Sequence, residues 1–148
     1  MIKLLVVEDD INKREQLHAF ALSRFPAFEV ADAESLIGGV RQLRHWHPDI
    51  VILDMTLPNY DLVNGSIDVT MQAFGGEEFL RQCMRFKLHP TVIVVTQFET
   101  LGEGGDEKGR DELAGELAAS FPDTYHGMVY YQLSCQHQLS CQHQPVGR

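Results

Sequence analysis

Short apolar runs recur along the chain, and the distance between successive runs leaves room for a helix. Residues 50–53 are Ile, Val, Ile and Leu, and residues 91–95 are Val or Ile after one Thr. Continuous runs of this kind are typical of strands that a sheet buries on both faces. The runs predict five strands, over residues 2–7, 28–31, 50–53, 91–95 and 128–131.

Between these runs, apolar residues return every three or four positions, which is the spacing of an amphipathic helix. The pattern predicts helices over residues 13–25, 35–44, 77–87 and 111–120. Strands that alternate with helices pair in parallel through right-handed crossovers. The predicted fold class is therefore α/β, a doubly wound five-stranded parallel sheet with helices on both faces.

Three segments do not follow the alternation. Residues 58–76 are rich in Pro, Asn, Asp, Ser and Gly and predict a long loop, and the glycine-rich residues 102–109 predict a mobile one. In the tail, the sequence QLSCQH of residues 132–137 is repeated at 138–143. We therefore predict one domain over residues 1–131 and a low-complexity tail over 132–148 that replaces or disrupts a last helix.

Composition narrows the classes of function. The 148 residues are 44% hydrophobic, enough to bury a core in one domain without disulfides. A net charge of -9 disfavours direct binding to nucleic acid or to anionic membranes. The apolar runs are too short to span a membrane, no signal-peptide pattern is present, and three cysteines do not form a disulfide framework. A cytoplasmic location is expected.

Acidic and hydroxyl residues follow three of the predicted strands. Glu8 and Asp9 follow the first, Asp54 the third and Thr96 the fourth. The carboxyl ends of parallel strands share one edge of a sheet, where ligands bind. Carboxylates gathered there repel one another unless a hard cation compensates, and oxygen ligands suit Mg²⁺ or Mn²⁺. A carboxylate beside such a metal can act as a nucleophile and form an acyl phosphate.

These segments resemble the receiver domains of two-component response regulators. Residues 4–10 (LLVVEDD) resemble the first-strand signature of that family, residues 54–58 (DMTLP) its phosphoacceptor segment, and residues 94–96 (VVT) its fourth strand. The resemblance covers about residues 1–131 and implies a flavodoxin-like three-layer fold. It also implies that Asp54 receives a phosphoryl group from a histidine kinase or a phosphotransfer protein.

The resemblance further implies roles for the other site residues. Glu8, Asp9, Asp54 and the backbone carbonyl of Thr56 would hold Mg²⁺ or Mn²⁺. Thr96 would hydrogen-bond the phosphoryl group and act as a switch, coupled to an aromatic residue of the fifth strand, Tyr131 or Tyr130. The chain would act through a downstream protein effector that the sequence does not identify, and a homodimer remains open.

Two departures from the family pattern stand out. The family carries a lysine and a proline after the fifth strand, where residues 131–135 here read YQLSC. Loss of that cation weakens phosphoryl stabilisation and one link in the switch. Lys108 is a speculative substitute, whereas Lys13 and Arg14 are interpreted as a solvated helix face. The second departure is the long loop over residues 58–76, beside the expected site.

Two other functions compete with the phosphoacceptor hypothesis. A pseudo-receiver would keep the fold as a protein-interaction module and signal without phosphorylation, which the missing lysine permits. A phosphatase of the haloacid-dehalogenase type would need a second Asp two residues after the nucleophile, where Thr56 stands. The chain is therefore expected to transfer a phosphoryl group to and from itself and not to act as an enzyme on an external substrate.

Overall fold

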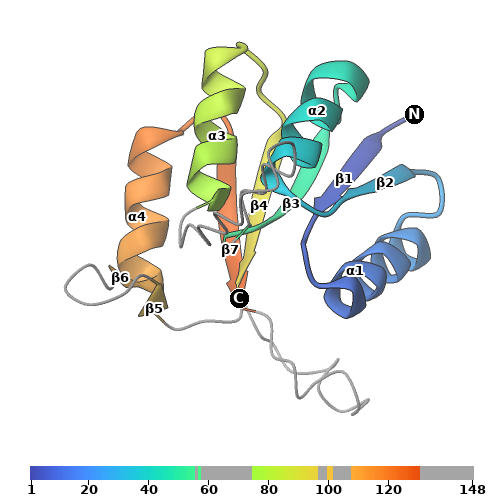
Figure 1. Ribbon diagram of the computed structural model, residues 1–148, viewed down its shortest axis with the longest axis horizontal. Coiled ribbons are helices and arrows are strands. Elements are labelled where there is room, and N and C mark those ends of the chain that lie inside the picture. The colour runs from blue at the N-terminus through green and yellow to red at the C-terminus, as the bar shows by residue number, and fades with distance from the viewer. Residues whose placement is uncertain (56, 58–74, 97–99, 102–107, 131–148) are drawn as a thin grey trace, which may run out of the picture.

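The computed structural model describes residues 1–55, 57, 75–96, 100–101 and 108–130. Strands and helices alternate through most of this part of the chain (Figure 1). The elements are β1 Lys3–Val7, α1 Ile11–Arg24, β2 Glu29–Ala33, α2 Leu36–Trp46, β3 Ile50–Asp54, α3 Gly75–Arg85, β4 Thr91–Thr96, β5 Thr100–Leu101, β6 Lys108–Gly109, α4 Arg110–Ser120 and β7 Tyr125–Tyr130.

The main sheet has five strands in the order β2-β1-β3-β4-β7, and every neighbouring pair is parallel. The chain thus begins in the interior of the sheet, winds outward to β2, and then returns past β1 to build β3, β4 and β7. This order confirms the predicted α/β class, a doubly wound five-stranded parallel sheet with the flavodoxin-like arrangement.

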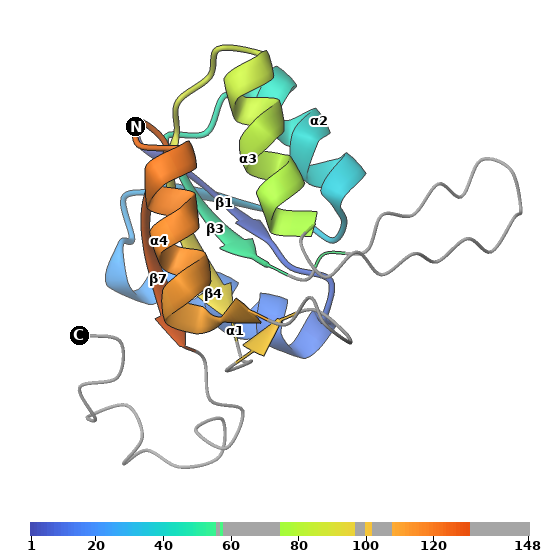
Figure 2. The same cartoon turned by 90° about the vertical axis from the view of Figure 1, so that its left-hand side faces the viewer.

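Alternate residues of β1 face the two layers of helices. Leu5 and Val7 belong to a large core that also contains buried residues of α2, α3 and α4, whereas Leu4 and Val6 pack with Ala21 of α1. Figure 2 shows α2, α3 and α4 together on one side of the sheet and α1 on the other. Because side chains of a strand alternate between its faces, a strand buried on both must be apolar throughout, as these runs are.

The structure corrects several predicted boundaries. Asp54 is the last residue of β3, not the residue after it, and β7 begins at Tyr125, three residues before the predicted start. On either side of residues 102–107, β5 and β6 pair as a short antiparallel ladder that the pattern did not predict, because two-residue strands carry no periodicity. Most of the predicted 58–76 loop and the repeated tail lie outside the described residues.

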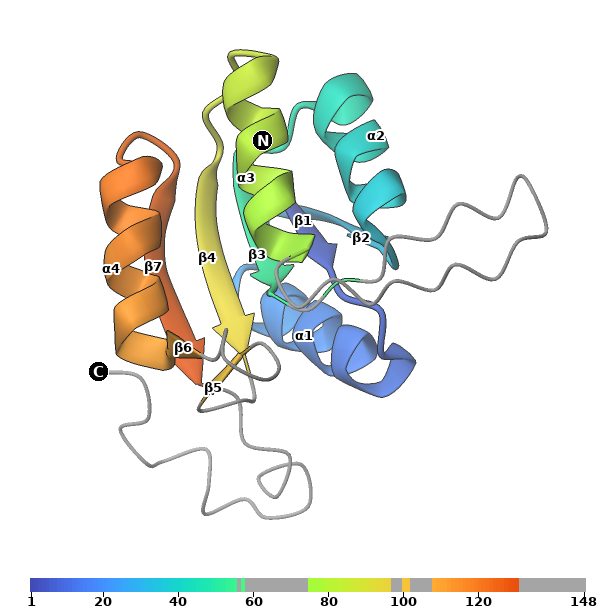
Figure 3. The ribbon, with the colours of Figure 1, turned by 60° about the vertical axis from the view of Figure 1, so that its left-hand side comes forward.

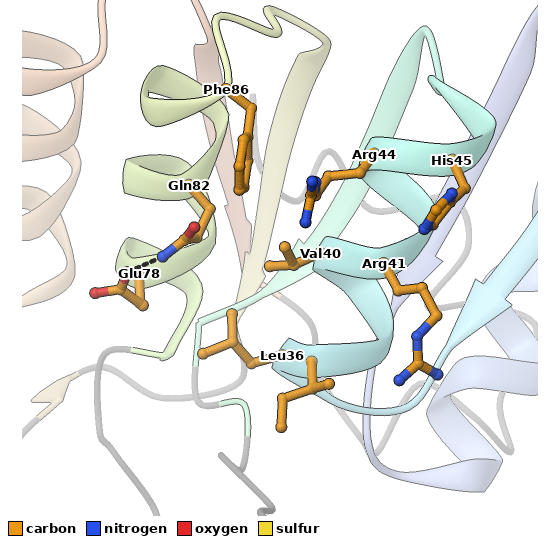
Figure 4. A pocket seen from close by; sticks show the side chains of 9 residues that line it. Leu36, Val40, Arg41, Arg44, His45, Glu78, Gln82 and Phe86 are labelled. Atoms are coloured by element: carbon orange, nitrogen blue, oxygen red, sulfur yellow. Dashed lines mark hydrogen bonds between the residues drawn. The ribbon is translucent and has the colours of Figure 1, made fainter.

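A hollow of about 570 Å³ lies between α2 and α3 (Figure 4). The guanidinium carbon of Arg44 on α2 lies 4.4 Å from the centre of the Phe86 ring, which follows α3. On α3, the side-chain amide of Gln82 donates a hydrogen bond of 2.9 Å to Glu78. The hollow lies beside the helices and not at the strand ends, so it is separate from the predicted acidic site.

Within the described residues, no helix is both long and apolar enough to cross a membrane.

Candidate metal centre at the carboxyl edge of the sheet

The register of the strands places the predicted site residues along one edge. Val7 is paired with Leu53, Asp54 with Val95, and Thr96 with Tyr130. Glu8, the residue after Val7, therefore lies beside Asp54, and Asp54 lies one step from Thr96. In Figure 3 the arrowheads of β3, β4 and β7 all point to this edge.

Three carboxylates meet at this edge. Glu8, Asp9 and Asp54 each offer an oxygen atom, and these atoms all lie within 4.8 Å of one another. The side chains of Glu8 and Asp54 are only 2% and 6% exposed, whereas Asp9 is exposed to solvent. The cluster is thus open on the side of Asp9 and closed on the side of Glu8.

The buried position of Glu8 changes its acidity. Removal from water and the negative charge of Asp54 raise the pKa of Glu8 from its ordinary value of 4.5 to about 8, against the opposing effect of the Lys13 ammonium. Both causes disfavour the charged carboxylate. At neutral pH, the cluster therefore relieves its repulsion by keeping a proton on Glu8.

The donor set fits a hard divalent cation. Oε2 of Glu8 accepts a hydrogen bond of 3.1 Å from the Asp10 backbone amide. Oε1 of Glu8 is buried, 2.7 Å from Nζ of Lys13. Mg²⁺ typically takes one or two carboxylates and keeps several waters, which this half-open cluster allows. Mg²⁺ would supply the positive charge that lets all three carboxylates ionise together.

The other predicted site residues are only partly covered by the structure. Thr96 ends β4 with 1% exposure, and its pairing partner Tyr130 is half-buried. Thr56 and Tyr131 lie outside the described residues. The switch role of Thr96 with Tyr130 or Tyr131, and the metal contact of Thr56, therefore stay predictions.

The interpretation of Lys13 as a solvated residue is wrong. Its side chain is only 3% exposed, and its Nζ lies 2.7 Å from Oε1 of Glu8 and 3.7 Å from Oδ1 of Asp54. The sequence spacing could have predicted this burial, because Lys13 stands four residues before Leu17 and eight before Ala21, and both of these face the sheet. Residues four apart share one face of a helix, so Lys13 lies at the site end of the buried stripe.

Comparison with known proteins finds two curated relatives that cover most of the chain. No family model matches the chain. It is 36% identical over 132 residues to the uncharacterized protein y4jR of Sinorhizobium fredii, covering 88% of this chain and 87% of the relative. It is 29% identical to the Detocs response regulatory protein DtcB of Enterobacter cloacae, covering 91% of each.

Solved structures of response-regulator proteins share the fold of this chain. The chemotaxis protein CheY4 of Vibrio cholerae superposes with a TM-score of 0.61 at 15% identity, covering 96% of each chain. The response-regulator domain of Thermotoga maritima CheB gives a TM-score of 0.60 at 18% identity, covering 92% of this chain and 86% of that one. The chain has the fold of a response-regulator receiver domain. This confirms the fold that the resemblance implies.

Arg14 also belongs to the site of this receiver domain, contrary to the prediction that it is solvated. Its guanidinium Nη1 donates hydrogen bonds of 2.9 Å to the backbone carbonyl of Glu8 and 3.4 Å to that of Asp9. The carboxylate of Asp10 accepts from the backbone amides of Asn12 and Lys13 and so caps α1. Together these contacts hold the backbone of the acidic loop between β1 and α1.

The start of α3 packs directly on the end of β3. The backbone amide of Gly76 donates a hydrogen bond of 2.9 Å to the carbonyl of Met55. A Cβ atom at Gly76 would lie 2.8 Å from the carbonyl oxygen of Asp54, and one at Gly75 would lie 2.5 Å from that of Leu57. Glycine at both positions lets α3 approach the backbone that carries Asp54, which sequence reasoning interpreted only as a helix start.

Proposed function

We propose that this receiver domain is a phosphoacceptor signalling domain that takes a phosphoryl group on Asp54 while Glu8, Asp9 and Asp54 hold Mg²⁺. One observation carries the proposal: Asp54 ends a central strand, nearly buried, with oxygens of Glu8 and Asp9 within 4.8 Å. A metal bound there would neutralise these carboxylates and leave an Asp54 oxygen free to react.

The proposed step is a single phosphoryl transfer. An oxygen of Asp54 forms a bond to phosphorus while the bond from phosphorus to the donor atom breaks. In a phosphohistidine donor, that atom is a ring nitrogen, which keeps the bonding electron pair. The donor would be a histidine kinase or a phosphotransfer protein. The phosphorylated domain would then signal by changing its contacts with a downstream protein, and it would not turn over an external substrate.

The name of the relative DtcB, a response regulatory protein, supports a signalling role for this chain. A pseudo-receiver that does not need phosphorylation is the second candidate, favoured by one observation. No lysine follows Lys108 in the sequence, so the cation that the family carries after the fifth strand is missing.

Intact mass distinguishes the two candidates. The chain is incubated with acetyl phosphate or phosphoramidate and Mg²⁺, with EDTA as the metal control. Asp54→Ala removes the proposed acceptor, and Asp123→Ala, at an exposed turn residue, is the matched control. We expect a metal-dependent gain of one phosphoryl group in the native chain and in Asp123→Ala, and none in Asp54→Ala. A folded native chain that gains nothing from either donor is a pseudo-receiver.

A further inference from the structure

The ammonium of Lys13 is held against the proposed phosphoacceptor. Lysine is almost never fully buried unless it is paired, because removing an ammonium from water is costly. Here its Nζ is paired with two acidic side chains, Glu8 at 2.7 Å and Asp54 at 3.7 Å. The pairing brings a fixed positive charge next to the atom that would receive phosphorus.

The helix dipole does not favour a lysine at this position. Lys13 is the third residue of α1, and the first turn of this helix contains no acidic residue. Cations near a helix N-terminus are disfavoured by the helix dipole, since that end is already positive. The lysine and the helix N-terminus instead add their positive potentials at the acidic cluster. The residue that is unfavourable for the helix therefore increases the positive potential at the site.

The other lysines do not occupy this place. Lys3 lies at the start of β1, where its Nζ donates to the backbone carbonyl of Trp46, and Lys87 is exposed beyond α3. The side chain of Lys108 is not among those that the structure describes. Among the lysine side chains that are described, Lys13 is the one that reaches Asp54.

We infer that Lys13 binds the phosphoryl oxygens on Asp54 and does the work of the lysine missing after the fifth strand. Phosphorylation replaces one carboxylate charge with a phosphoryl group that bears more negative charge and additional acceptor oxygens. The flexible four-carbon stem of lysine lets Nζ move from the carboxylate oxygen to an oxygen on phosphorus. Such a charge-assisted hydrogen bond stabilises both the transferring group and the product.

This inference rests on the proposed function, because Lys13 needs a phosphoryl group to bind. The test compares Lys13→Met and Lys13→Gln, which remove the charge, with Lys13→Arg, which keeps it. Lys87→Met is the matched control on an exposed lysine. Each variant is incubated with acetyl phosphate and Mg²⁺. We measure the rate of phosphoryl gain by intact mass, the lifetime of the phosphoryl group, and the ³¹P chemical shift of the phosphoaspartate. Circular dichroism melts show which variants are folded.

We expect Lys13→Met and Lys13→Gln to gain the phosphoryl group roughly 10- to 100-fold more slowly, which matches the loss of one charge-assisted hydrogen bond. Their ³¹P shift should move, whereas Lys87→Met should match the native chain and Lys13→Arg should retain part of the rate. A merely structural lysine would alter the melting temperature without moving the ³¹P shift.

The remaining outcomes separate the two proposals. Native rates, lifetimes and ³¹P shifts in folded Lys13→Met and Lys13→Gln would overturn the role of Lys13 and leave the phosphoacceptor function standing. If neither the native chain nor any variant gains a phosphoryl group, both proposals fail together. If the charge-removing variants fold poorly, folded Lys13→Arg decides the case. A partly retained rate together with a ³¹P shift that differs from the native one supports the phosphoryl contact, whereas a native rate and a native shift would overturn it.

Discussion

Replacing Glu8 with Gln should change how the stability of the metal-free domain depends on pH. The folded state raises the pKa of Glu8 from 4.5 to about 8, mainly through burial and the charge of Asp54. Between these two pH values, the folded state holds a proton that the unfolded chain has released. The contribution of Glu8 to stability is therefore fully present below pH 4.5 and is lost as pH rises through 8.

The size of this effect follows from the two pKa values. At about 1.4 kcal/mol for each pH unit, the change from 4.5 to about 8 corresponds to about 5 kcal/mol in the free energy of unfolding. About 3 kcal/mol of this falls between pH 5.5 and pH 8. Glu8→Gln keeps the shape of the neutral acid and cannot ionise, and Asp54 still faces Lys13, so the variant should not show this loss.

Urea denaturation in EDTA at several pH values measures the effect. The free energy of unfolding of the native chain, relative to that of Glu8→Gln, should fall by about 3 kcal/mol from pH 5.5 to pH 8. Groups elsewhere titrate alike in both proteins and cancel in the difference. Adding Mg²⁺ at pH 8.5 should stabilise the native chain more than the variant, since the ionised Glu8 binds the metal. Parallel curves for the two proteins in EDTA would refute the reasoning about Glu8.

Three further changes test the packing around the site. Gly76→Ala should lower the free energy of unfolding by about 1–3 kcal/mol, since its Cβ would lie 2.8 Å from the carbonyl oxygen of Asp54. Gly115→Ala, in the exposed middle of α4 with nothing within 4 Å, should raise it by about 0.5–1 kcal/mol, and equal effects in urea melts would contradict the close approach. Asp10→Ala should cost about 1 kcal/mol by removing the α1 cap, whereas Asp10→Asn should keep most of it; a neutral alanine variant would argue against the cap. Arg14→Ala should weaken Mg²⁺ binding several-fold in calorimetry by loosening the acidic loop, and unchanged affinity would show that the loop holds itself.

The apolar runs determine most of the fold. Residues such as Val51, Leu53, Val92 and Val94 are fully buried because a parallel sheet covered by helices needs apolar side chains on both faces. Acidic residues at the ends of such runs then come together at one edge, since parallel strands end together. The predicted fold class and the order of its five parallel strands and intervening helices followed from these features and were confirmed, whereas several boundaries and the β5–β6 ladder were not predicted.

The tertiary structure decided what the sequence spacing left open. Lys13 and Arg14 are charged residues at the start of a helix, and such residues are ordinarily solvated. Only the seating of α1 against the sheet encloses Lys13 between Glu8 and Asp54 and turns Arg14 onto the backbone of the acidic loop. The raised pKa of Glu8 has the same origin. Its burial and the nearby charge of Asp54, which is distant in the sequence, act only after the chain has folded. Sequence patterns report which residues are apolar along one element, whereas the partner of a buried charge is chosen by the packing of several elements.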